Sequence, residues 1–158
     1  MNYFLNILPS LLSGLKMTLG VFFLTIVGSV PLGIIVSLGM KSEYFTIRWL
    51  INGYIWIMRG TPLLLQLIFV YYGLGMMGIT FPRFEAAAIA FIINYGAYLA
   101  EIFRGGLQAV PRGQYDAAKV LGLNKVQTFF KIILPQVIKI VVPSFGNEII
   151  NLVKDTSL

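Results

Sequence analysis

The sequence contains no histidine and no cysteine among its 158 residues. Without histidine it lacks the side chain that most often acts as a metal ligand or as a general base near neutral pH. Without cysteine it can form no disulfide and no thiolate nucleophile. A glycine-rich phosphate loop ending in Lys-Ser or Lys-Thr is also missing from the sequence. We therefore expect no catalytic residues, no metal site and no cofactor site, and we predict that the chain is not an enzyme.

Charged residues are also scarce. They make up 11% of the sequence, whereas 58% is hydrophobic, and the mean hydropathy is +0.84. A soluble domain carries about a quarter charged residues. The composition therefore predicts an all-α polytopic membrane helix bundle, with residues 1–158 forming a single transmembrane domain. The net charge of +6 does not indicate nucleic acid as a partner, because the basic residues are spread over several loops.

The first long uncharged run covers residues 17–40 and is long enough for one membrane span. Ser29, Gly33 and Ser37 recur every four residues along this run. They form a face of small residues that suits close contact between helices, although the same residues also fit ordinary membrane-helix composition.

The second apolar stretch, 49–75, is interrupted by the sequence Arg59-Gly60-Thr61-Pro62. In one interpretation, residues 49–58 lie at the membrane interface and the span begins near Thr61. In the other, one long kinked helix runs through and Arg59 lies inside the membrane, where an arginine costs roughly 2.5–3.5 kcal/mol on insertion scales. Arg59 is then either an interfacial, structural residue or a residue that faces a transport path.

Two further spans must include charged residues. The uncharged run 86–100 is short, so this span also takes in its flanking charges, and Glu101 and Arg104 can pair across one helical turn. The last span, at about 132–153, is the weakest by hydropathy because polar residues interrupt it. We expect about four spans in all.

Polar residues near the end of the chain form a stripe if they lie on a helix. Asn147, Asn151 and Lys154 follow one line, with Glu148 and Asp155 beside it. Buried polar residues in a membrane segment usually mark a pathway. The substrate-path candidates are Arg59, Asn147, Glu148, Asn151, Lys154, Asp155, Thr156 and Ser157.

The same polar residues also allow a purely structural interpretation. In this second interpretation, Asn147 and Asn151 form hydrogen bonds with each other. Lys154 and Asp155 then neutralise each other near the membrane interface. Both interpretations remain open at the level of the sequence.

The basic stretch 105–131 lies between the last two apolar segments. The sequence Ala-Ala-Lys-Val-Leu at 117–121 favours a helix, which Gly122 then ends. Apolar residues recur at spacings of three and four over 123–130, so a second short amphipathic helix is expected there. The pattern predicts a helix, a glycine turn and a helix outside the membrane, with a surface for a partner.

Three motifs resemble those of bacterial ABC-importer permeases. The sequence has Asp116-Ala117-Ala118, then Gly122, then Ile132-Ile133-Leu134-Pro135 at the spacing of the family's cytoplasmic signature, with Asp116 where the family usually has Glu. Arg59-Gly60-Thr61-Pro62-Leu63-Leu64 and Lys154-Asp155-Thr156-Ser157-Leu158 resemble motifs of its polar-amino-acid branch, the histidine/glutamine type. The likeness runs from about Leu8 to the last residue.

The resemblance implies the fold of a type I ABC-importer permease with one more span, so we expect a chain that lacks the final C-terminal span. It implies the uptake of a polar amino acid delivered by an extracytoplasmic binding protein. A cytoplasmic ABC ATPase subunit would bind the ATP, and a second permease subunit, identical or different, would complete the path. The residues themselves leave open an ATP-independent channel or a proton-coupled carrier, in which Glu101 or Glu148 would relay protons.

The resemblance also assigns a role to the stretch 105–131, which would be the ATPase-docking loop. Asp116 could cap the short helix or pair with a basic group of the partner. Gly122 would permit a sharp turn. The docking candidates are Gly113, Asp116, Ala117, Ala118 and Gly122.

The distribution of lysine and arginine predicts the orientation. If 41–48 and 104–131 share one side of the membrane, that side holds most of the basic residues, and Arg83 and Lys16 remain for the other. Because positive charge is enriched on the cytoplasmic side, we expect the long loop in the cytoplasm. The N-terminus then lies outside a bacterial cytoplasmic (inner) membrane.

Overall fold

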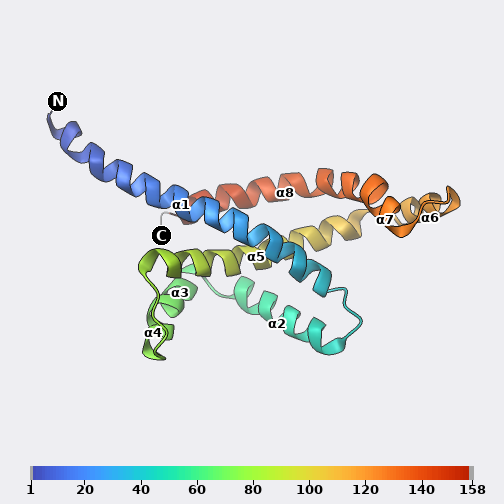
Figure 1. Ribbon diagram of the computed structural model, residues 1–158, viewed down its shortest axis with the longest axis horizontal. Helices are drawn as coiled ribbons and strands as arrows, with labels where there is room; N and C mark the ends of the chain where they lie inside the picture. Colours follow the sequence, from blue (N-terminus) through green and yellow to red (C-terminus); the bar gives the residue numbers. More distant parts are fainter. Residues whose placement is uncertain (1, 157–158) are drawn as a thin grey trace.

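A computed structural model describes residues 2–156, and these residues are almost entirely helical (Figure 1). The helices are α1 (Asn2–Gly39), α2 (Phe45–Gly60), α3 (Leu63–Ile68), α4 (Leu74–Met76), α5 (Arg83–Ala109), α6 (Arg112–Val120), α7 (Lys125–Thr128) and α8 (Leu134–Asp155), with π-helical turns at Phe69–Gly73 (η1) and Phe129–Ile133 (η2). Residues 2–156 contain no strand. The predicted all-α class is confirmed.

Three helical segments of the described chain are long and apolar enough to cross a membrane. They are Ile7–Gly39, Arg83–Ala109 and Lys125–Asp155. A fourth crossing is present if Phe45–Gly60 and Leu63–Met76 count as one broken span, which is bent by 108°. The expected four spans therefore correspond to three continuous helices and one broken pair.

The break between α2 and α3 follows from its sequence. Thr61 precedes a proline and is extended, with φ −121° and ψ 143°, because the proline ring disfavours a helical conformation in the residue before it. Pro62 is also extended at ψ 138°, and a helix resumes at Leu63. The interpretation of this stretch as one long kinked helix is therefore wrong. The placement of residues 49–58 at the membrane interface stays a prediction.

Helix α5 lies at the centre of the bundle, where it contacts α1, α2, α3 and α8. Its contact with α1 is the most extensive, and small residues make it possible. Ser29 and Ser37 are buried, and a Cβ atom at Gly33 would lie 2.9 Å from Cβ of Leu99 and 3.1 Å from the backbone nitrogen of Ala100. The predicted small-residue face is therefore confirmed as a helix contact.

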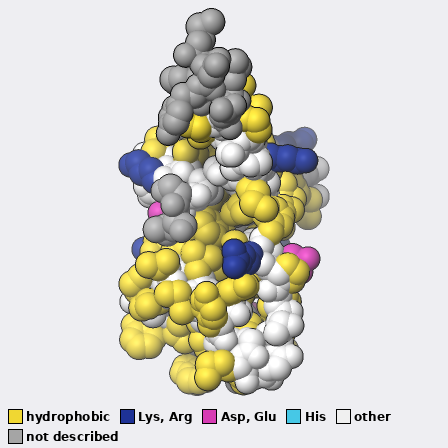
Figure 2. Space-filling view, turned by 90° about the vertical axis from the view of Figure 1, so that its left-hand side faces the viewer, with side chains coloured by type: hydrophobic (Ala, Val, Ile, Leu, Met, Phe, Trp, Pro, Cys, Tyr) yellow, Lys and Arg dark blue, Asp and Glu magenta, His cyan; other side chains and the backbone are white. Residues whose placement is uncertain are grey.

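Apolar side chains cover much of the outside of the described chain. Trp49, Trp56 and Phe130 are among the large side chains that are mostly exposed. In Figure 2, hydrophobic side chains dominate the lower and middle parts of the visible face, and charged groups are isolated. A membrane can cover such a surface, whereas water would solvate it poorly.

The polar loop contains the expected helix, glycine turn and helix. Helix α6 ends before Gly122, which has φ +74°, and α7 follows from Lys125. The second helix is not a separate short element, because α7 continues through η2 into α8 as one span, Lys125–Asp155. At the other end, α5 extends to Ala109, so the proposed docking stretch 105–131 begins inside α5.

Candidate functional site

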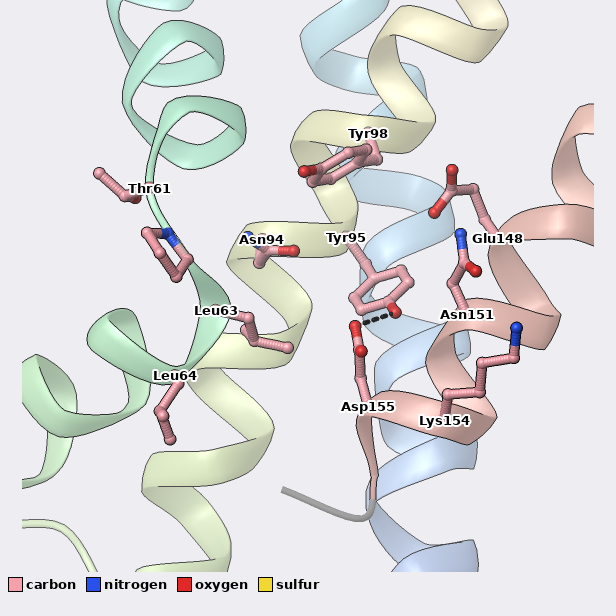
Figure 3. Close-up of a pocket in the computed structure, with 11 residues that line it drawn as sticks. Thr61, Leu63, Leu64, Asn94, Tyr95, Tyr98, Glu148, Asn151, Lys154 and Asp155 are labelled. Carbon is pink, nitrogen blue, oxygen red and sulfur yellow. Dashed lines mark hydrogen bonds between the residues drawn. The ribbon is translucent and has the colours of Figure 1, made fainter.

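A polar pocket of about 470 Å³ lies between the α2–α3 break, α5 and α8. Figure 3 shows side chains from these three elements pointing toward a common space. The pocket is lined by Thr61, Pro62, Leu63, Leu64, Asn94, Tyr95, Tyr98, Glu148, Asn151, Lys154 and Asp155. We refer to this set as the polar pocket.

Most of the polar stripe predicted on the last helix lines the polar pocket. Glu148, Asn151, Lys154 and Asp155 all do so from α8. Because these positions are three, four and seven residues apart, one helical face carries them all. The structure thus brings together the carboxylates and the amine that the sequence had placed on one stripe.

The remaining members of the predicted stripe lie elsewhere. Asn147 is exposed on α8 and is not part of the pocket lining. Thr156 follows α8, and its hydroxyl donates a 2.7 Å hydrogen bond to the carbonyl of Val153. Ser157 lies outside the described residues 2–156.

Helix α5 supplies Asn94, Tyr95 and Tyr98 to the pocket, and none of them was a candidate from the sequence. Tyr95 is 4% exposed, and its hydroxyl donates a 2.7 Å hydrogen bond to Oδ2 of Asp155. Its ring is stacked on Phe91, with 6.2 Å between centroids. A lone amide inside the uncharged run 86–100 is the signal that could have singled out this part of α5.

Arg59 contacts two side chains of α5 beside the polar pocket. Its Nη1 lies 4.0 Å from Oε2 of Glu101, and its guanidinium carbon lies 5.2 Å from the ring centroid of Tyr98. A cation over an aromatic ring contributes about 0.5–1 kcal/mol at an exposed site. Arg59 is also in the last turn of α2, where a cation is favoured by the helix dipole. It does not line the polar pocket itself but contacts Tyr98, which does.

The pairing of Glu101 with Arg104 is confirmed. Arg104 forms an ion pair with Glu101 across one turn of α5, and its Nε donates a 3.1 Å hydrogen bond to the same carboxylate oxygen. Glu101 therefore lies between two guanidinium groups, those of Arg59 and Arg104. The three side chains connect the end of α2 with α5.

The docking candidates lie together on α6 and the turn that follows it. Ala118 is only 2% exposed, whereas Gly113, Asp116 and Ala117 are exposed. The capping role considered for Asp116 is wrong, because α6 begins at Arg112 after Pro111 and has no side-chain cap hydrogen bond. Asp116 falls in the middle of the helix, where it has no free backbone amide to accept from.

The glycine turn has a regular hydrogen-bond pattern. The amide of Leu123 donates to the carbonyl of Ala118, and the amide of Gly122 donates to the carbonyl of Lys119, both at 3.0 Å. This pair of bonds is the Schellman motif, which requires a left-handed residue. Asn124 then caps α7 in a reciprocal capping box with Gln127, a feature that sequence reasoning missed although the pattern is visible.

Around this turn the chain exposes an apolar surface. Val120 and Leu121 are 87% and 76% exposed, and Val126 is also exposed. Large apolar side chains at a turn in a polar, basic segment are typical of a surface that binds another protein.

The chain was compared with known proteins. Residues 29–158 match the family described as binding-protein-dependent transport system inner membrane component. The L-cystine transport system permease protein TcyB of Bacillus subtilis (strain 168) is 37% identical over 150 residues, which are 95% of this chain and 64% of that protein. The arginine transport system permease protein ArtQ of the same organism is 36% identical over 152 residues, which are 96% of this chain and 69% of that protein.

A solved structure is also similar. The crystal structure of an amino acid ABC transporter with histidines matches with a TM-score of 0.88 and 39% sequence identity. The match covers 98% of this chain and 72% of that chain. The predicted type I ABC-importer permease fold is therefore confirmed.

The fold and these matches define an integral membrane component of a transport system. The chain belongs to the family of binding-protein-dependent transport system inner membrane components. Within this family it is similar to permeases of amino-acid ABC transporters. It spans 64% of the length of the cystine permease. The family and the apolar helices identify it as a multi-pass protein of the inner membrane.

Proposed function

We propose that this chain forms part of the translocation path of an ATP-driven importer of a polar amino acid. The observation that carries the proposal is the polar pocket, in which carboxylates, an amine, amides and tyrosines converge between a broken span and two long helices. Polar groups are costly within a membrane protein unless they have partners or serve a pathway. The relatives named for cystine and arginine support an amino acid as the substrate.

The lining residues suggest how a zwitterion would bind. Asp155 accepts a hydrogen bond from the buried Tyr95 of another helix. We therefore assign the substrate ammonium group to Glu148, which is hydrogen-bonded within its own helix, α8, to Asn151. Lys154 lines the opposite end of the same α8 face and supplies a cation for the substrate carboxylate. Arg59 contributes to the electrostatic environment through Tyr98 and not as a lining residue.

The energy would come from a partner. We propose that a cytoplasmic ABC ATPase subunit binds ATP, so the chain itself holds no cofactor, and that it docks on α6 and the Gly122 turn. The exposed apolar side chains Val120, Leu121 and Val126 support such a docking surface. A second permease subunit, identical or different, and an extracytoplasmic amino-acid-binding protein complete the proposed transporter. The N-terminus is proposed to lie outside.

The alternative, a proton-coupled carrier, is not favoured. Such a carrier would use Glu101 or Glu148 as a proton relay, and Glu101 is paired with Arg59 and Arg104. The similarity to amino-acid ABC transporter permeases supports the ATP-driven importer instead.

Reconstitution tests the proposal. The chain, or its full-length version if it is part of a longer permease, is assembled in liposomes with its ATPase and binding protein, and uptake of labelled arginine, glutamine and cystine is measured. We expect uptake that depends on ATP and survives a protonophore. Uptake that needs no ATPase and stops with the protonophore would reject the proposal in favour of the carrier.

A further inference from the structure

The break between α2 and α3 leaves backbone carbonyl groups without their usual helical hydrogen-bond donors. Because α2 stops at Gly60, the carbonyl groups of its last turn have no helical amide to accept from. Irregular backbone within a membrane is tolerated only where protein groups or a water-filled cavity satisfy it. The hydroxyl of Thr61 donates to the carbonyl of Ile57 at 2.8 Å, but the carbonyls of Met58 and Thr61 need other donors.

Two amide side chains supply these donors. Nε2 of Gln66, in α3, lies 3.0 Å from the carbonyl of Met58, 3.2 Å from the carbonyl of Thr61 and 2.8 Å from Oγ1 of Thr61. Nδ2 of Asn94, in α5, donates to the same Met58 carbonyl at 3.1 Å. It also donates to Oε1 of Gln66 at 3.0 Å. Asn94 therefore bonds to the chain on both sides of the bend, from a third helix.

Asn94 lines the polar pocket, but its amide donors are bonded to residues on both sides of the α2–α3 break. A side-chain amide has two N–H donors, and here one serves Met58 before the break and the other serves Gln66 after it. Asn94 is also 4% exposed. Its donors are thus committed to the backbone geometry of the break.

We infer that Asn94, acting through Gln66, is a positioning residue that fixes the angle between α2 and α3. The bend determines where Thr61, Pro62 and Leu63 form one wall of the polar pocket. The pair would therefore hold this wall in place for the substrate, a role that rests on the proposed function. The fixed angle itself is a property of the fold and does not depend on transport.

The angle is measured directly by distances between two spin labels. The sequence has no cysteine, so Trp49→Cys on α2 and Met76→Cys on α4, both at exposed side chains, provide the only attachment sites. We expect a single narrow distance distribution in the otherwise unchanged protein. Asn94→Leu has a similar volume and removes both donors, so we expect the distribution to broaden or shift.

A second variant and a control accompany the first. Gln66→Met keeps the length of the side chain and removes the donors to both carbonyls, at a less buried position than Asn94, so it serves if Asn94→Leu does not fold. Asn52→Leu changes an exposed asparagine of α2 and should leave the distribution narrow. Because Asn94 and Gln66 act as one unit, the double variant should broaden it no more than the larger single change. An unchanged distribution in either folded single variant overturns the inference.

Uptake per folded molecule distinguishes a displaced pocket wall from a loss of folded protein. Per folded molecule, Asn94→Leu should raise the substrate concentration for half-maximal uptake by about tenfold, because a displaced wall loses contacts with the substrate, and should preserve the maximal rate. A shifted bend with unchanged half-saturation would show that the pocket is not the substrate path, which rejects the proposed function of the pocket. An unchanged bend with normal transport would instead reject the positioning role of Asn94.

Discussion

The hydroxyl of Tyr95 donates a 2.7 Å hydrogen bond to Oδ2 of Asp155 and so joins the middle of α5 to the last turn of α8. Tyr95 is buried, and Asp155 is half-buried at the edge of the polar pocket. The bond crosses sixty residues of sequence. The bond orients the carboxylate of Asp155. Glu148 carries the second carboxylate that lines the pocket.

Replacing Tyr95 with phenylalanine removes this bond with little change in shape. A hydrogen bond to a charged group contributes about 1.5–3 kcal/mol, and the open pocket lets water replace part of it. We therefore expect Tyr95→Phe to lower the free energy of unfolding by about 1 kcal/mol, measured by denaturant unfolding in detergent. Tyr44→Phe, at an exposed tyrosine, is the control. Equal losses in the two variants would contradict the assigned bond.

The contact between α1 and α5 should not tolerate a side chain at Gly33. A Cβ there already meets Leu99 and the backbone of Ala100 at about 3 Å, so Gly33→Leu must push the helices apart. Overpacking typically costs 1–3 kcal/mol, and a backbone obstacle places this variant at about 3 kcal/mol. Gly14→Leu on the same helix meets nothing within 4 Å and should be neutral. Thermal unfolding of the two purified variants compares them.

The glycine turn after α6 requires glycine at position 122. Its φ of +74° is unfavourable for an L-residue by about 1–2 kcal/mol, and more so for a β-branched one. Since a Cβ at this position meets nothing within 4 Å, the effect of Gly122→Val comes from the backbone alone. We expect normal membrane insertion but loss of substrate-stimulated ATP hydrolysis and uptake. Gly53→Val, on α2 and outside the docking stretch, also meets nothing within 4 Å and should retain both activities. Normal coupling in Gly122→Val would rule out the docking role.

The proposed orientation is tested by labelling from each side of the membrane. A cysteine replacing Gln114 on α6 should react with an impermeant reagent only from the cytoplasm. A cysteine replacing Met77, an exposed residue after α4, should react only from outside. The basis is the enrichment of lysine and arginine on the side of α6. The opposite labelling pattern would contradict both the proposed orientation and the proposed site of ATPase docking.

The last prediction concerns the charges of the polar pocket. Glu148→Gln and Lys154→Met should each raise the concentration for half-maximal uptake by about tenfold or more, because each removes one charge that faces the zwitterion. Arg83→Gln, at the start of α5 and outside the polar pocket, should change it little. Uptake is measured per folded molecule. Reduced yield with unchanged half-saturation would mean that the stripe on α8 is structural.

Sequence reasoning predicted the parts of the fold that local chemistry determines. The charge-free run 17–40 identified the later part of α1, which begins at Asn2. The alanines before Gly122 identified α6 and its turn. The charges of Glu148, Lys154 and Asp155 in an apolar context identified one side of the pocket. Each of these signals is contained in a few neighbouring residues.

The other side of the pocket depends on contacts between distant segments. Tyr95 and Tyr98 lie in an apolar run where aromatic residues are ordinary, so nothing local distinguishes them. Pro62 indicates an interruption, but no neighbouring residue specifies the 108° bend, on both sides of which the chain contacts α5. The sequence likewise did not show that α7 continues into α8, because Pro135 comes just after the π-helical turn and proline usually marks the start or the interruption of a helix.

Helix α5 runs without interruption from Arg83 to Ala109. It carries Asn94 at the polar pocket, and it ends directly before the segment that holds α6. With a rise of 1.5 Å per residue, Asn94 lies about 22 Å from the end of the helix. If the helix is rigid over this length, a tilt of about 5° at its α6 end displaces the pocket wall by roughly 2 Å. A small movement of a docked partner would thus displace the pocket wall without any change of secondary structure.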